Sequence, residues 1–426
     1  MRRAKPKNES PREEAEGVIE ALGHRGEGVV TVRGQSVYVP LTVAGDRVRF
    51  AHAGERGELL EVLEGGPARV AAPCVHFGAC GGCQLQHVDA DTYTSFKVEG
   101  LRAALGARGI ACEIAPLARV PRASRRRATL AFAHTGNAVT LGFHGGHSHA
   151  LTGIEGCLVL VPQIVDALAP LREWLAGILP DRATGTLHAT ACENGLDLDL
   201  ELERSRLQDN RAIAARLSAG PQGIAVARVT VSGDIAAQHA PPVIAFDGIK
   251  VTMPSRAFLQ PTVEGEGLLR DWVVEGVGEA KRVCDLFSGL GTFALPLARR
   301  AAVHAVDMER APLDALGAAW RGQTGLKPVT VECRDLMRAP LQVSELKGVG
   351  ALVFDPPRAG ASAQAAQIAL SGVPRVVAVS CNPATFARDA RILLDAGYRL
   401  DWLRPLDQFL FTAHIELVAQ FSKAKS

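Results

Sequence analysis

The sequence has few aromatic residues and no long apolar run. Aromatic residues make up 5% of the 426 residues while hydrophobic residues reach 47%, so a large core has to be built mainly from aliphatic side chains. No stretch comes near the roughly 18 consecutive apolar residues of a membrane-spanning helix, and the charged start MRRAKPKNESPREEAEG lacks the apolar region of a secretory signal. We expect a soluble, cytoplasmic protein with no membrane partner, and no obligate protein partner is evident.

An excess of charge of either sign is also missing. The formal net charge is +2, so nucleic-acid binding would depend on local basic patches. Five arginines do fall within the nine residues RVPRASRRR, namely Arg119, Arg122, Arg125, Arg126 and Arg127. Such a run is usually a solvated face, but in a nearly neutral chain we interpret it as a phosphate-binding RNA surface.

The nine cysteines are an odd number, and a reducing compartment disfavours structural disulfides. Three of them, Cys74, Cys80 and Cys83, are crowded into PCVHFGACGGCQLQH, a pattern that indicates metal binding or cysteine chemistry. Zinc sites and iron–sulfur clusters typically use four protein ligands. Spacing alone leaves both groups open, and it leaves the fourth ligand open among Cys112, Cys157, Cys192, His76 and His87.

The usual nucleotide-binding glycine motifs are not present at the C-terminal glycine turn. DLFSGLGTFALPLA, residues 285–298, runs from an apolar strand through Ser-Gly-Leu-Gly into an apolar helix. The spacing is not GxGxxG and no GxxxxGK[ST] occurs, which weakens dinucleotide and nucleoside triphosphate readings. Glycines there let the backbone approach a ligand closely, and Asp307, at the end of the next strand, is placed to accept hydrogen bonds from ribose hydroxyls.

The chain length and its changing pattern predict a multidomain protein. We expect a disordered arm at 1–16, an OB-like β-barrel of short strands at 17–68, and an α+β central domain with the cysteine loop and an RNA-binding surface at 69–250. At 251–426 strands alternate with helices, which is typical of an α/β doubly wound, Rossmann-like domain.

Two further strands of this domain end in reactive groups. Asp355 precedes two prolines in GALVFDPPRAG, where a central strand has to stop. Cys381 in VAVSCNPATFARD comes at the corresponding edge one strand later, beside Asn382 and a helix N-terminus whose dipole favours thiolate. Glu416 lies in the strand-like run HIELVA, where burying an unpaired carboxylate is costly unless it has a function.

Together these segments resemble the bacterial RNA 5-methyluridine (uracil-C5) methyltransferases, which use S-adenosylmethionine. The resemblance spans nearly the whole chain and rests on a TRAM-type N-terminal barrel, the C-x5-C-x2-C loop with QLQH, SRRRATL, AFLQPT, DLFSGLGTFALPLA, DPPRAG, SCNPATFARD and HIELVA. The cysteine loop favours the iron–sulfur members, many of which act on 23S rRNA, over the tRNA enzymes that generally lack the cluster.

The resemblance implies a role for each matching residue. Cys381 is implied as the nucleophile and Glu416 as the base. The implied S-adenosylmethionine contacts are Gln260, Phe287, Asp307 and Asp355. The implied ligands of a [4Fe–4S] cluster are Cys74, Cys80, Cys83 and Cys157.

The sequence departs from the family pattern at three positions. Asp307 stands where many relatives have Glu, Thr262 replaces a usual Asn, and Phe411 falls where His is common. Three alternatives stay open: a tRNA uracil-C5 methyltransferase, a non-covalent RNA methyltransferase acting on an exocyclic amine, and an inactive iron–sulfur or zinc RNA-binding protein.

Overall fold

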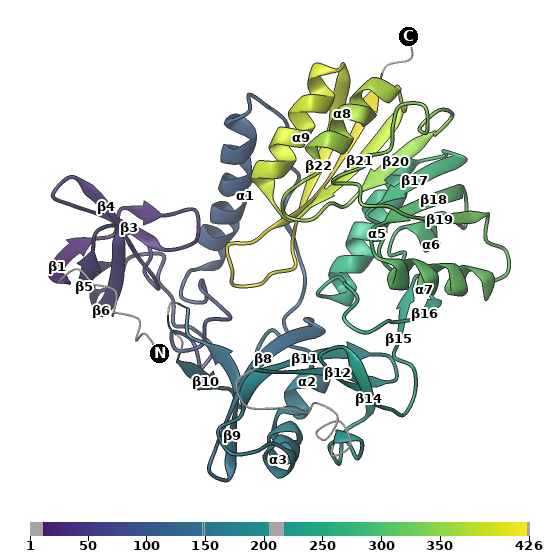
Figure 1. The fold of residues 1–426 in the computed structure, drawn as a ribbon. Coiled ribbons are helices and arrows are strands. Elements are labelled where there is room, and N and C mark those ends of the chain that lie inside the picture. Colours follow the sequence, from purple (N-terminus) through teal and green to yellow (C-terminus); the bar gives the residue numbers. More distant parts are fainter. Residues whose placement is uncertain (1–11, 147, 149, 204–216, 424–426) are drawn as a thin grey trace, which may run out of the picture. The chain divides into compact units, whose positions relative to one another are not determined.

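The computed structural model describes residues 12–146, 148, 150–203 and 217–423. The chain forms two compact units (Figure 1). The first comprises Met1–Gly100, Gly145–His149 and Phe411–Ala413, and the second comprises Leu101–His144, Ala150–Leu410 and His414–Ser426. No helix in the described ranges is long and apolar enough to span a bilayer.

The first unit is built on a six-stranded sheet in the order β1-β5-β6-β4-β3-β2. Its strands are β1 Glu13–Val18, β2 Ala21–Leu22, β3 Gly28–Val32, β4 Gln35–Val39, β5 Arg47–Ala53 and β6 Arg56–Glu64. A Cβ atom on Gly17 would lie 2.7 Å from Val30 Cγ2. The sheet therefore folds back on itself around a hydrophobic core that includes Val30, Val48 and Phe50.

Strand β1 begins inside the stretch that the sequence analysis assigned to a disordered arm, so that boundary is wrong for residues 13–16. The strand pairs along its whole length with β5, from Glu13 opposite His52 to Val18 opposite Arg47. Its acidic residues face arginines, as in the 3.2 Å ion pair between Glu13 and Arg33. Residues 1–11 of the expected arm lie outside the described residues.

The central part of the second unit is a seven-stranded sheet in the order β10-β9-β8-β11-β12-β13-β14. Its strands are β8 Arg127–Thr135, β9 Ala138–His144, β10 Leu151–Gly153, β11 Thr184–Cys192, β12 Gly195–Leu202, β13 Val226–Val231 and β14 Asp234–Gln238. Helices α2 Pro162–Asp166 and α3 Leu168–Ile178 pack against it (Figure 1). The hairpin of β15 Val243–Phe246 and β16 Ile249–Thr252 leads into the C-terminal part.

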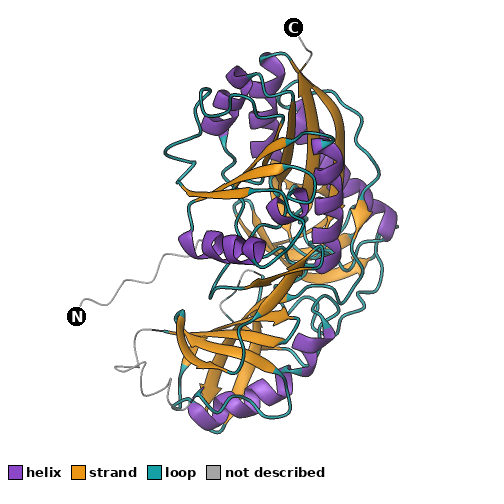
Figure 2. Ribbon diagram, turned by 90° about the vertical axis from the view of Figure 1, so that its right-hand side faces the viewer, coloured by secondary structure: helices purple, strands orange, loops and turns teal. Residues whose placement is uncertain are grey.

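The C-terminal part is an eight-stranded sheet in the order β19-β18-β17-β20-β21-β23-β22-β7. Its strands are β7 Ala118–Arg119, β17 Arg282–Leu286, β18 Ala302–Asp307, β19 Val329–Cys333, β20 Ala351–Phe354, β21 Arg375–Ser380, β22 Tyr398–Asp407 and β23 Glu416–Lys423. Its helices are α5 Val263–Val277, α6 Ala294–Leu297, α7 Arg310–Arg321, α8 Ser362–Ser371 and α9 Pro383–Asp395. Helices lie on both faces (Figure 2), which confirms the expected doubly wound architecture.

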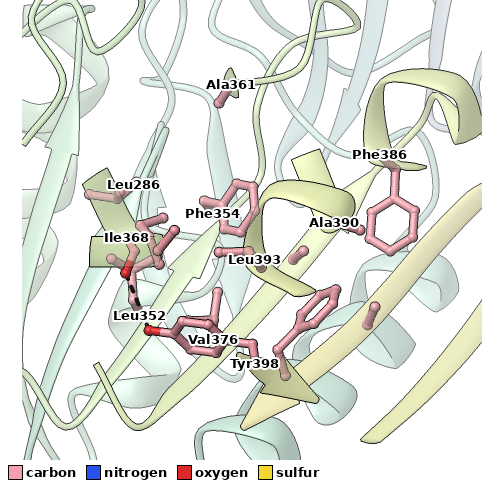
Figure 3. Packing of buried hydrophobic residues seen from close by; sticks show 14 of the residues in the cluster. Leu286, Leu352, Phe354, Ala361, Ile368, Val376, Phe386, Ala390, Leu393 and Tyr398 are labelled. Atoms are coloured by element: carbon pink, nitrogen blue, oxygen red, sulfur yellow. Dashed lines mark hydrogen bonds between the residues drawn. The ribbon is translucent and has the colours of Figure 1, made fainter. Parts of the chain in front are cut away.

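Some residues of the C-terminal domain come from the segment that we expected to form the central domain. Helix α1, Ala90–Gly106, contributes Leu101 and Leu105 to the core shared with α8 and α9. In that core the Tyr398 hydroxyl donates to the carbonyl of Ile368 at 3.2 Å (Figure 3). Strand β7 also joins the sheet beside β22. The predicted boundary at residue 251 thus omits earlier segments that complete the domain.

Candidate active site

The carboxyl edge of the C-terminal sheet gathers the predicted reactive residues. Asp355 follows β20, and Cys381 follows β21. Glu416 opens β23, which runs antiparallel to β21 with Ser380 opposite Leu417. The end of β21 and the start of β23 therefore meet at one edge, and the three predicted side chains are brought together there.

Two glutamines link the carboxylates of this edge. Gln260 Nε2 donates to Asp355 Oδ2 at 3.2 Å. Gln408, directly after β22, donates through Nε2 to Gln260 Oε1 and to Glu416 Oε2, both at 3.0 Å. A continuous hydrogen-bonded chain thus runs from Asp355 to Glu416. The sequence analysis identified Gln260 but missed Gln408, which belongs to no motif of recognisable spacing.

Burial controls the charge of these groups. Glu416 is 3% exposed, and burial, reinforced by Asp355, raises its pKa to about 8 although Gln408 and Arg358 favour the charged form. Burial likewise raises the pKa of Asp355 to about 7. Both carboxyls therefore gain and lose protons near neutral pH, the range in which a general base is most useful.

The thiol of Cys381 differs from the expectation of a thiolate favoured by the helix dipole. Cys381 does precede α9, whose N-cap Asn382 accepts from the Ala384 amide at 3.1 Å. Burial nevertheless raises the pKa of Cys381 to about 11, and Glu416 and Asp355 add to the effect while Arg358 opposes it. Because burial and the two carboxylates outweigh the effect of Arg358, the resting form is the thiol.

The DPPRAG loop is fixed to the start of α9. The carbonyl of Arg358 accepts from Asn382 Nδ2 at 3.0 Å and from Thr385 Oγ1 at 3.2 Å. The Ala361 amide donates to the buried carboxylate of Asp389 at 2.7 Å. These bonds set the positions of Asp355 and Arg358 relative to Cys381.

A small open pocket lies beside Asp355 at the end of β17. Its lining residues are Phe258, Gln260, Phe287, Ser288, Gly289, Leu290, Thr292, Phe293 and Asp355. A Cβ atom on Gly289 would meet no atom within 4 Å, so a ligand can approach the backbone there. Phe258, which is 66% exposed, is a lining residue that the sequence analysis missed.

Asp307 stands at the rim of the glycine turn. Its carboxylate accepts from the Gly289 amide at 2.9 Å and from the Glu309 amide at 2.8 Å. These bonds hold the turn against β18 and orient the carboxylate. The cofactor contact predicted for Asp307 stays a prediction.

Asp285 lies behind the cavity wall and was not singled out from the sequence. It is 0% exposed, and neither carboxylate oxygen has a hydrogen-bond partner among the described residues, although the Ala294 backbone is near enough to favour the charged form. Burial and the charge of Asp355 raise the pKa of Asp285 well above its usual value. Buried carboxylates beside an open glycine turn fit a ligand that brings positive charge, as S-adenosylmethionine does.

The structure corrects the interpretation of the arginine cluster as one RNA surface. Arg126 is 5% exposed and donates to Glu266 and to the Gln260 carbonyl. Arg127 donates to the Leu259 carbonyl at 2.6 Å, and burial, with help from neighbouring arginines, lowers its pKa to about 10. These two residues hold the AFLQPT segment in place. Arg119 and Arg122 are the exposed members of the cluster.

The cysteine loop is a series of tight turns in the first unit. The Cys80 amide donates to the His76 carbonyl at 2.8 Å, and Gly78 has a φ of 91°. Cys74, Cys80 and Cys83 are all half-buried. The Gly82 amide points to Cys80 Sγ at 3.5 Å. The end of the loop is anchored by Phe411, whose carbonyl accepts from two loop amides, those of Gln84 and Leu85.

A group of candidate metal ligands lies away from this loop, in the second unit. In the described part of the chain, the residues whose ligand atoms all lie within 4.8 Å of one another are His188, Asp199 and Glu201. Arg256 already pairs with both of those carboxylates. Cys157 lies in the second unit, where the Val159 amide donates to its sulfur at 3.4 Å.

Comparison with known proteins gives consistent matches. A family model described as tRNA (Uracil-5-)-methyltransferase matches residues 332–423. An uncharacterized RNA methyltransferase of Brucella suis is 42% identical, over 96% of this chain and 97% of that protein. A 23S rRNA (uracil(1939)-C(5))-methyltransferase of Halomonas elongata is 33% identical, over 94% of this chain and 87% of that protein.

The fold also matches a solved structure. The Pyrococcus abyssi tRNA (uracil-54, C5)-methyltransferase, in complex with S-adenosyl-L-homocysteine, aligns with a TM-score of 0.73 at 22% identity. The alignment covers 96% of this chain and 100% of that chain. At this identity the match concerns the fold alone.

Proposed function

The chain belongs to the RNA uracil-C5 methyltransferases, and from this premise we propose that it methylates C5 of a uridine in 23S rRNA through a covalent adduct between Cys381 and C6. The observation that carries the proposal is the pairing of Ser380 with Leu417, which brings Cys381 and Glu416 to one edge beside Asp355. A non-covalent methyltransferase would have no use for this thiol and carboxylate pair.

The uracil ring needs activation before it can accept a methyl group. C5 of uracil is a weak nucleophile, and addition of the Cys381 thiolate to C6 converts the ring to an enolate with electron density at C5. S-adenosylmethionine supplies the methyl group when bound. Gln260, Phe287, Asp307 and Asp355 are the residues proposed to hold it.

The resting state of Cys381 fits this order of events. Glu416 and Asp355 disfavour the thiolate in the protein alone. A cationic ligand held by Asp355 would offset that negative charge, so the thiol would ionise once the methyl donor is in place. The Cys381 thiol would therefore stay unreactive until the methyl donor is bound.

Glu416 is proposed to remove the C5 proton. After methyl transfer C5 carries both the methyl group and a hydrogen, and the thiolate cannot leave until a base takes that proton. The raised pKa of Glu416 makes its carboxylate a stronger base than an ordinary glutamate. Proton removal regenerates the C5–C6 double bond and expels the thiolate of Cys381.

The substrate class rests on the relatives. The Halomonas elongata protein is named as a 23S rRNA enzyme, and we propose the same RNA here. A target uridine has to be splayed out of its stack to reach the buried Cys381. The six-stranded sheet of the first unit is proposed as a TRAM-type RNA-binding barrel, with Arg119 and Arg122 as phosphate contacts.

A [4Fe–4S] cluster is proposed on Cys74, Cys80, Cys83 and Cys157. The half-buried thiols and the amide donors to Cys80 and Cys157 support a cluster held by four thiolates. Its proposed role is structural.

The test compares transcripts of 23S rRNA and of tRNAs as methyl acceptors, with 5-methyluridine identified by mass spectrometry. The proposal expects 5-methyluridine in the 23S transcript and none in tRNA. Methylation of tRNA alone would overturn the substrate class. Methylation of an exocyclic amine, or no transfer to either RNA, would overturn the reaction.

A further inference from the structure

Gln408 is a buried amide beside the proposed base. It is 1% exposed. Its Nε2 donates to Glu416 Oε2 and to Gln260 Oε1, each at 3.0 Å. A side-chain amide nitrogen carries two hydrogens, so both are used. The Oε1 of Gln408 is buried and accepts no hydrogen bond from the part of the chain that the structure describes.

The orientation of this amide is determined by its neighbours. Gln260 Nε2 is engaged by Asp355, so Gln260 Oε1 faces Gln408 and has to accept. A reversed Gln408 amide would place its oxygen against two acceptor oxygens. On the other side Gly265 closes the space, because a Cβ atom there would lie 2.6 Å from Gln408 Oε1.

Other charged groups also face Glu416. Asp355, after β20, repels the carboxylate, and Arg358, on the following loop, favours it. Cys381, after β21, is the facing thiol and becomes negative when it ionises. Gln408 is the donor that the structure places directly on a Glu416 oxygen, so it opposes the effects of burial and of Asp355.

Building on the proposed covalent mechanism, we propose that Gln408 is a positioning residue that stabilises the ionised form of Glu416, the form able to accept the C5 proton, while fixing Gln260 toward Asp355. A hydrogen bond to the charged form of an acid favours that form. Loss of Gln408 should therefore raise the pKa of Glu416 by about one unit. A residue that only fills space would leave that pKa unchanged.

The experiment is an infrared titration of the buried carboxyl groups in protein without RNA, from about pH 6 to about pH 10. Gln408→Met keeps the volume and removes the donor, and Gln408→Met/Glu416→Gln identifies the Glu416 band. The control is Gln420→Met. Gln420 lies in β23, the strand that begins with Glu416, and is 5% exposed. We expect the Glu416 midpoint to rise in Gln408→Met and to stay in place in Gln420→Met.

An unmoved midpoint in Gln408→Met would overturn the proposal. If this variant does not fold, Gln408→Asn is titrated instead, because its amide is one methylene too short to reach Glu416 and the same rise is expected. The titration needs no substrate, so it separates failure of this inference from failure of the proposed methylation. With RNA, the pH at which adduct resolution is half-maximal should rise by the same amount.

Discussion

Arg126 and Glu266 form an ion pair in which both side chains are buried. The pair joins the start of the central sheet to α5, and Arg126 also donates to the Gln260 carbonyl. Burial raises the pKa of Glu266 even though Arg126 lowers it. Arg126 therefore has a structural role, because it holds the backbone of Gln260 in position.

Arg126→Met should destabilise the protein strongly because it leaves Glu266 buried without its partner. Removing one member of a buried pair costs about 3–5 kcal/mol. The double variant Arg126→Met/Glu266→Met should recover much of this loss, as measured by denaturant unfolding. A fully stable Arg126→Met with weakened RNA binding would contradict the structural role.

Arg122→Met is the matched control for that variant. Arg122 lies on the exposed side of the same cluster, so its stability should change by about 0.5 kcal/mol or less. Its RNA affinity should fall, and the slope of log affinity against log salt should decrease by about 1. An unchanged salt dependence would exclude Arg122 from the RNA surface.

Asp355→Asn should make Cys381 more reactive in the protein alone. The Asp355 charge contributes to the raised pKa of the thiol, and each unit of pKa lowered gives up to about tenfold more thiolate. Alkylation of Cys381 by iodoacetamide, followed by peptide mass spectrometry, should be several-fold faster at about pH 8 than in the wild type.

The effect of Asp355→Asn on the alkylation rate should depend on pH. Because the pKa of Asp355 is about 7, the carboxyl is largely neutral at about pH 6, and the effect of Asp355→Asn should shrink there. Asp395→Asn, at an exposed carboxylate on α9, should leave the alkylation rate unchanged. Equal rates for Asp355→Asn and the wild type at pH 8 would contradict the assigned charge coupling.

Glu416→Gln should gain stability relative to the wild type as pH rises. The folded pKa of Glu416, about 8, lies above the unfolded value of about 4.3. The protonated native carboxyl therefore contributes stability that is fully present below the unfolded pKa and is lost as pH rises through the folded pKa. Between about pH 5 and about pH 8 the difference in unfolding free energy should grow by on the order of 3 kcal/mol.

Glu275, whose pKa is shifted in the opposite direction, serves as the control for this comparison of unfolding free energies. Arg404 lowers the pKa of Glu275, so Glu275 is ionised in both states across this pH window. The stability difference between Glu275→Gln and the wild type should stay flat. A flat difference for Glu416→Gln as well would mean that Glu416 is not buried with a raised pKa.

Cys157→Ser tests the proposed cluster. The wild-type protein, purified without oxygen, should be brown and contain about four irons per chain, with broad absorption near roughly 400 nm. Cys157→Ser should lose most of the iron, whereas Cys112→Ser should retain it. One zinc and no iron in the wild type would exclude the cluster, and full iron in Cys157→Ser would exclude that ligand.

The strand ends of the catalytic sheet could be predicted from the sequence because they follow general rules. Asp355 precedes two prolines that no central strand can contain. Asp307 ends one apolar strand and Cys381 follows another, in a segment where strands alternate with helices. The carboxyl ends of such parallel strands meet at one edge of the sheet. Glu416 was assigned through the family resemblance, and the antiparallel β23 explains how so distant a residue reaches that edge.

Other features depend on partners that are remote in sequence. Strand β7, Ala118–Arg119, exists only because it pairs with β22. The roles of Arg126 and Gln408 are set by Glu266 and Gln260, which lie 140 and 148 residues away, respectively. Charge clustering suggested RNA for Arg126 because burial cannot be read from a run of arginines. Thr262 serves as the N-cap of α5, which the resemblance to the family did not predict.

The central claim is that Cys381 is the nucleophile, and trapping with fluorinated RNA tests it most directly. Target RNA carrying 5-fluorouridine is incubated with S-adenosylmethionine and run on a denaturing gel, because fluorine cannot leave C5 as a proton does. Wild type and the exposed-cysteine control Cys333→Ala should form a stable protein–RNA adduct, and Cys381→Ala should form none. An adduct with Cys381→Ala would contradict the account.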